Sequence, residues 1–90
     1  MMVREHIYFS GEVQGVGFRF RASMIANELG LTGWCRNLYD GRVECELQGE
    51  QSVINRFIVR MRNERWIDIT NVEMHEMPVD SREKGFNITY

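Results

Sequence analysis

The spacing of apolar residues changes along the first third of the chain from a strand-like to a helical period. Between Val3 and Phe9, apolar and polar side chains fall on opposite faces, with Ile7 and Phe9 on the apolar one, which predicts a strand. From residue 18 onward, apolar residues recur at i, i+4, i+7, i+8 and i+11, which is one stripe on a helix. The members of this stripe are Phe18, Ala22, Ile25, Ala26 and Leu29. Gly30 follows directly, and a glycine at that place predicts the end of the helix.

The remaining elements follow from the same kind of pattern. Two strands are predicted over Gly33–Leu38 and Arg42–Gln48, because the Asp-Gly pair between them is a hairpin signal. The second strand alternates strictly, so we expect one buried face and one solvated face. A helix is predicted over Ser52–Asn63, a strand over Ile67–Met77, and a short closing strand over Phe86–Tyr90.

This order of elements predicts an α+β fold of the ferredoxin-like type. The chain runs strand, helix, strand, strand, helix, strand (βαββαβ, the split βαβ arrangement), with an antiparallel sheet and both helices on one face. Ninety residues leave room for one core, so residues 1–90 are expected to form a single domain. Such folds carry enzymes, RNA binders and regulatory modules alike, so function has to be argued from a site.

Charge and composition narrow the classes of partner. The net charge is -2, so no overall attraction to nucleic acid or to an anionic membrane is expected. No apolar run approaches the ~20 residues that span a bilayer, and no signal-peptide core is evident, so a cytoplasmic location is expected. His6 and His75 are isolated on strands among charged neighbours. We therefore expect both at the surface, outside any metal site or catalytic triad.

The segment Gly11–Arg19 is the main candidate for chemistry. Its glycines lie between a strand and a helix start, where the backbone can turn sharply and direct its N–H groups into one concavity. The helix N-terminus adds unpaired amides and a partial positive charge, and Arg19 in the first turn can add a full one. These features suit a phosphate, although a tight turn with an exposed arginine accounts equally well for the spacing. A Walker loop is excluded because the only lysine is Lys84.

Three motifs carry a resemblance to a known family. They are Val13-Gln14-Gly15-Val16-Gly17-Phe18-Arg19, then Gly33-Trp34-Cys35-Arg36-Asn37, then Asp40-Gly41-Arg42-Val43-Glu44. In sequence and in spacing these resemble the acylphosphatase family, and the length and element order match over the whole chain. The final Gly85–Tyr90 segment is similar to the closing strand of that family.

The resemblance implies a hydrolase that splits the carboxyl–phosphate bond of small acyl phosphates and uses no metal or other cofactor. It assigns phosphate binding to Gln14, Gly15, Val16, Gly17, Phe18 and Arg19, and catalysis to Arg19 and Asn37. In this assignment Asn37 orients the attacking water. The chain departs from the family at Glu12, where a basic residue is usual; we expect its carboxylate to face solvent. Cys35 stands where the family usually has valine.

Two other functions remain as alternatives. The first is a non-catalytic module that binds phosphate or acyl phosphate with the same loop. The second is RNA binding on the open sheet face, which is disfavoured because Val43–Gln48 has two glutamates and no aromatic residue. The expected partners are therefore a small acyl phosphate and inorganic phosphate, with no nucleic acid and no membrane, and the protein is expected to act as a monomer.

The two cysteines are expected to face each other across the hairpin. Cys35 and Cys45 are both predicted on the core side of their strands. Two buried thiols in a reducing cytosol are favoured over a redox switch, and two cysteines are too few for a disulfide scaffold or a zinc site.

Overall fold

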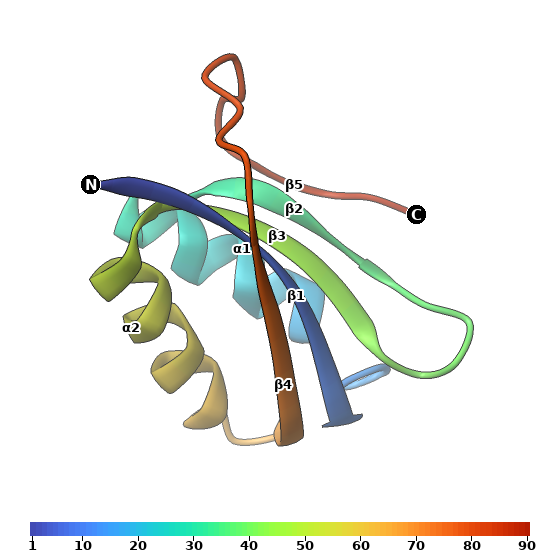
Figure 1. Ribbon diagram of the computed structural model, residues 1–90. Coiled ribbons are helices and arrows are strands. Elements are labelled where there is room, and N and C mark those ends of the chain that lie inside the picture. The colour runs from blue at the N-terminus through green and yellow to red at the C-terminus, as the bar shows by residue number, and fades with distance from the viewer.

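A computed structural model describes all 90 residues of the chain (Figure 1). It contains five strands and two helices. In chain order they are β1 (Met2–Glu12), α1 (Phe18–Leu29), β2 (Thr32–Asn37), β3 (Val43–Glu50), α2 (Gln51–Arg62), β4 (Asp68–Met77) and β5 (Phe86–Ile88). Every predicted element is present. The helix α1 has its predicted bounds, and no end of another element is shifted by more than three residues.

The strands form one sheet in the order β4-β1-β3-β2-β5, and both helices pack on the same face of it (Figure 1). All pairings among the first four strands are antiparallel, as predicted. The fifth departs from the predicted antiparallel sheet, because β5 pairs in parallel with β2. The chain reverses after β4 and crosses to the far edge of the sheet, so β5 runs in the direction that β2 already has.

The core lies between the helices and the sheet. The predicted stripe of α1 is buried at Phe18, Ala22, Ile25 and Ala26, and α1 ends at Gly30 as expected. The second helix contributes three buried residues: Ile54, Phe57 and Met61. The sheet meets them with its own apolar face, formed by Ile7, Phe9, Val43, Cys45 and Leu47, all 0% exposed. Neither helix has the length and apolar character needed to cross a membrane.

The first strand continues further than its alternation predicts. Gly11 and Glu12 pair with Ile69 and Asp68 of β4, after a bulge between Ser10 and Gly11. The expected loop Gly11–Arg19 is therefore shorter, because its first two residues belong to β1. Only glycine fits at position 11, since φ is +121° and a Cβ there would lie 2.2 Å from the Asp68 carbonyl oxygen.

The open face of the sheet is not the solvated surface that the pattern of β3 predicts. Arg4 is only 4% exposed on this face. Its guanidinium donates to Glu46 at 2.7 and 2.9 Å and to Glu83 at 2.7 and 2.9 Å. Burial of a charge is tolerated here because its donors are satisfied by carboxylates.

Neighbouring polar residues extend this network. Glu44 is 5% exposed and accepts from Arg36 at 2.6 Å. His6, predicted to be isolated at the surface, lies 2.7 Å from Glu44 and 3.1 Å from Glu46. That prediction was wrong, because the partners of His6 come from a strand about 40 residues away in the sequence. His75 is exposed as expected.

Candidate active site

A short loop of five residues, Val13–Gly17, connects β1 to α1. Gly15 and Gly17 adopt φ values of +74° and +82°, a region that favours glycine. Gly17 is the N-cap of α1 and carries no side chain to cap the first amides, and the first turn contains no acidic residue. The amides and the positive end of the helix dipole are therefore not neutralised from within the helix.

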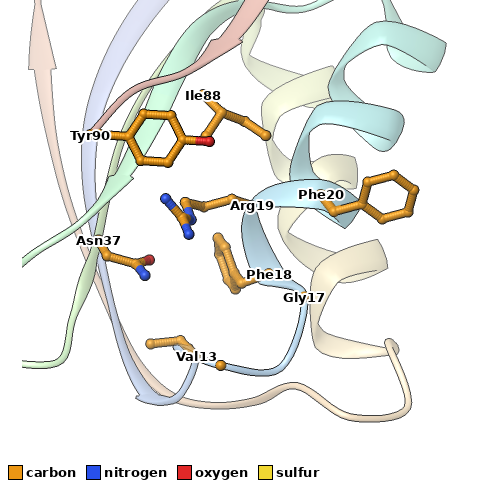
Figure 2. Close-up of a pocket in the computed structure, with 9 residues that line it drawn as sticks. Val13, Gly17, Phe18, Arg19, Phe20, Asn37, Ile88 and Tyr90 are labelled. Atoms are coloured by element: carbon orange, nitrogen blue, oxygen red, sulfur yellow. The ribbon is translucent and has the colours of Figure 1, made fainter.

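The loop forms one wall of a cavity of about 230 Å³ (Figure 2). The cavity is bounded by the loop, the first turn of α1, the end of β2 and the end of the chain after β5. Its lining residues are Val13, Gly15, Gly17, Phe18, Arg19, Phe20, Asn37, Ile88 and Tyr90. A cavity of this volume has room for a small substrate only.

Arg19 projects from the first turn of α1 into this cavity (Figure 2). Its guanidinium carbon lies 5.1 Å from the centre of the Tyr90 ring, within the range of a cation–π contact. Nearby arginines are paired with carboxylates, as Arg21 is with Glu64 and Arg36 is with Glu44. Arg19 has no such partner, so its hydrogen-bond donors are available to an anion.

Asn37 is the last residue of β2, opposite Val43 of β3. Its amide points into the cavity from the side opposite Arg19 (Figure 2). The sequence places these two residues eighteen positions apart, and the fold brings both to one cavity. An amide offers one acceptor and two donors, so it can orient a water molecule without taking its proton.

The six predicted phosphate ligands divide into two groups. Gly15, Gly17, Phe18 and Arg19 line the cavity, whereas Gln14 and Val16 are not among its lining residues. The side chain of Gln14 turns instead to the β2–β3 hairpin, where Nε2 donates to the carbonyls of Leu38 at 2.7 Å and Arg42 at 2.8 Å. Gln14 thereby ties the loop to the strand that ends in Asn37.

Glu12 is exposed and is not among the residues that line the cavity. It pairs with Asp68 of the edge strand β4. The carboxylate therefore faces solvent as expected, where water and salt screen its repulsion of a bound anion.

Ile88 and Tyr90 line the cavity, although the sequence did not single them out. The register of β5 explains their place, because Cys35 pairs with Ile88 and the backbone N–H of Thr89 donates to the carbonyl of Cys35 at 2.8 Å. Continued by two residues, the same register brings Tyr90 beside Asn37. A parallel pairing of distant strands leaves no local signal in the sequence.

The site therefore combines the Arg19 guanidinium, the unpaired backbone amides at the start of α1 and the side-chain amide of Asn37 with an apolar rim. This set of groups can bind an oxyanion and hold a water molecule near it. No group of three or more His, Cys, Asp or Glu side chains is placed to hold a metal ion.

Comparisons with known proteins bear on the family and the fold of this chain. A family model described as acylphosphatase matches residues 5–88. An acylphosphatase of Bifidobacterium longum is 38% identical over 89 residues, which cover 97% of this chain and 92% of the relative. Another, from Clostridium beijerinckii, is 37% identical over 90 residues, which cover 99% of this chain and all of the relative. The crystal structure of acylphosphatase from Bacillus subtilis matches with a TM-score of 0.89 at 32% identity and full coverage of both chains.

Proposed function

Since this chain belongs to the acylphosphatase family, we propose that its cavity holds the phosphoryl group of a small acyl phosphate between the Val13–Gly17 loop and Arg19, while Asn37 orients the attacking water. The chain is a hydrolase of the carboxyl–phosphate bond. The observation that carries the residue assignment is the unpaired guanidinium of Arg19 facing the amide of Asn37 across one cavity.

Arg19 and the loop amides act on the charge of the transferring group. Phosphoryl transfer passes through a loose transition state with charge spread over the equatorial oxygens. The guanidinium offers parallel N–H donors to two of these oxygens, and the uncapped amides of α1 offer further ones. Because these donors are fixed before substrate arrives, they stabilise the transition state without reorganisation.

Asn37 positions the attacking water and contributes no charge. Its side-chain oxygen can accept a hydrogen bond from the water, and its NH₂ group can donate to the substrate. The proton that the water releases passes to a phosphate oxygen. The leaving group is a carboxylate, which departs without a strong general acid, and this fits a cavity lined by no carboxylic acid or histidine side chain.

The first experiment is hydrolysis of acetyl phosphate and benzoyl phosphate by the purified protein, with and without a chelator. We expect turnover in both conditions and competitive inhibition by inorganic phosphate. Arg19→Ala is expected to lower kcat/KM by on the order of 10³ or more, and Asn37→Ala is expected to lower kcat with a smaller effect on phosphate inhibition. Activity that persists undiminished in either variant would overturn the assignment of that residue.

Matched controls separate local chemistry from general loss of charge or stability. Arg65→Ala removes an exposed arginine that stacks on Trp66, 4.9 Å from its ring centre, and pairs with no carboxylate. Asn71→Ala removes an exposed asparagine from β4. Both variants are expected to retain full activity.

The second candidate is a domain that binds phosphate without turnover. The same loop and arginine support it, and the distinguishing element is Asn37, which simple anion binding does not need. A rise in melting temperature with phosphate, together with no hydrolysis of either substrate, would favour this alternative.

We further propose that the protein acts as a monomer in the cytoplasm and binds no nucleic acid. Arg19, Asn37 and the phosphate loop meet within a single chain, so the proposed site needs no residue of a second copy. Cys35 and Cys45 are free in this structure, which is the state of the reduced protein in a reducing compartment. On the open sheet face, Arg4 and Arg36 are paired with glutamates, which leaves little positive charge for a phosphate backbone.

A further inference from the structure

Cys35 of β2 and Cys45 of β3 are directly opposite each other in the sheet. Both are free thiols and both are 0% exposed on the core face. Burial raises the pKa of the Cys45 thiol, and the neighbouring Cys35 raises it further, so Cys45 is held as a neutral thiol in the folded protein.

The backbone pattern shows which kind of cross-strand pair they form. Leu38 donates its N–H to the carbonyl of Arg42 at 2.8 Å, which makes these two opposite residues a hydrogen-bonded pair. Hydrogen-bonded and non-hydrogen-bonded pairs alternate along an antiparallel ladder, so Cys35 and Cys45, three positions on, are a non-hydrogen-bonded pair. The carbonyl of Cys35 agrees with this, because it accepts from Thr89 of the neighbouring segment at 2.8 Å.

This class of pair lies close to the geometry of a disulfide. Non-hydrogen-bonded partners have Cα atoms about 4.5 Å apart, inside the ~4.4–6.8 Å range of disulfides. Their Cβ atoms are typically about 4.5–5.5 Å apart, against ~3.5–4.5 Å in a disulfide. Closing the bond therefore needs the two side chains to approach by about 1 Å. We propose that Cys35 and Cys45 form a reversible cross-strand disulfide that switches the hydrolase to a less active state.

The redox step is a thiol–disulfide exchange with a low-molecular-weight disulfide such as oxidised glutathione. One cysteine thiolate attacks the small disulfide, forms a mixed disulfide and releases one small thiolate. The second cysteine then attacks the protein sulfur of the mixed disulfide and releases the other. Two protein thiols are oxidised, one small disulfide is reduced to two small thiols, and the two protons leave with them. Because both thiols are buried, the exchange proceeds through local opening or during folding.

The disulfide would act on the catalytic step through Asn37, and this part of the inference rests on the proposed function. Asn37 is two residues beyond Cys35, on the same face of β2, and its opposite residue, Val43, is two before Cys45. A shift of about 1 Å at a catalytic group can cost up to ~10² in rate. We expect oxidation to lower kcat by about tenfold or more. The phosphate inhibition constant should change by no more than about twofold, because Arg19 and the loop belong to other elements.

The test starts with protein refolded in glutathione buffers of increasing oxidising strength. Intact mass and the number of free thiols after unfolding report the disulfide without reference to activity. The expected product has lost two hydrogens and both thiols, and dithiothreitol restores them together with kcat. Cys35→Val, a small apolar replacement, is the control and should keep its activity at every glutathione ratio.

Two results would overturn the inference. In one, both thiols remain free, or carry only glutathione, at the most oxidising ratio. In the other, the disulfide forms and kcat is unchanged. Absence of turnover in the fully reduced protein would instead count against the proposed function, and the mass measurement would still decide whether the disulfide forms.

Discussion

The side chain of Gln14 provides the sharpest test of how this fold positions its site. Its Nε2 donates to the carbonyls of Leu38 and Arg42, and so joins the phosphate loop to the hairpin. Gln14→Met keeps the length of the side chain and removes both donors. Each carbonyl retains one other hydrogen bond, from the N–H of Gly41 to Leu38 and from the N–H of Leu38 to Arg42. No buried acceptor is therefore left without a partner.

The magnitude follows from the two neutral hydrogen bonds that are lost. No carbonyl is orphaned, so each bond is taken at the lower part of its range, about 0.5–1 kcal/mol, and the loss in unfolding free energy should be about 1–2 kcal/mol. For a chain of this size, that corresponds to a fall in Tm of roughly 4–16 °C. Because the same bonds set the distance between the loop and Asn37, kcat/KM should fall by about tenfold.

Urea unfolding and the acyl phosphate assay measure the two effects. The matched control is Gln51→Met, which removes an exposed hydrogen bond that Nε2 of Gln51 donates to Oδ1 of Asn55 within α2. This change should cost at most about 0.5 kcal/mol. If Gln14→Met is no less stable than Gln51→Met, or if its kcat/KM is that of the parent protein, the anchoring role of Gln14 is refuted.

Three further predictions concern the rim, the open face and the loop. Tyr90→Leu should weaken inhibition by phosphate about two- to fivefold, because a cation–π contact worth about 0.5–1 kcal/mol no longer holds Arg19. Tyr90→Phe keeps the aromatic ring and should have the inhibition constant of the parent protein. Equal inhibition constants in all three proteins would contradict a role of the ring. The hydrogen bond from Arg4 holds the pKa of Glu83 below its usual value of 4.5. The stabilisation by ionised Glu83 is therefore present above pH 4.5 and is lost as the pH falls through the folded-state pKa. The Tm difference between the parent protein and Glu83→Gln should shrink on acidification below about pH 4.5. A Tm difference that is constant with pH would refute this prediction. Gly15→Ala should destabilise by about 1–2 kcal/mol in urea unfolding, since φ is +74° but a Cβ would meet no atom within 4 Å; a total loss of folding would show that more than backbone strain is involved.

Local patterns were sufficient for most of the fold. The 3.6-residue period of α1, the glycine at its end and the Asp-Gly hairpin signal each depend on neighbours within a few residues, and each was confirmed. The opposition of Cys35 and Cys45 also followed, because the hairpin turn sets the register of its two strands. In the site, motifs in the sequence indicated seven residues, and their roles stay predictions. Gly15, Gly17, Phe18, Arg19 and Asn37 line the cavity, whereas Gln14 and Val16 do not.

Only the tertiary structure decided which distant groups meet. The parallel pairing of β5 with β2 places Tyr90 at the cavity, and the burial of Arg4 depends on Glu46 and Glu83, 42 and 79 residues away. Such contacts join strands whose pairing depends on the packing of the whole sheet. A periodic pattern in the sequence shows which face of a strand is apolar, but it does not show what covers the other face. The sequence alone therefore predicted an anion site with Arg19 and Asn37, and the structure places both residues at one cavity. The fold determined that Gln14 anchors the loop, because its side chain could turn to the hairpin only once β2 and β3 had paired beside it.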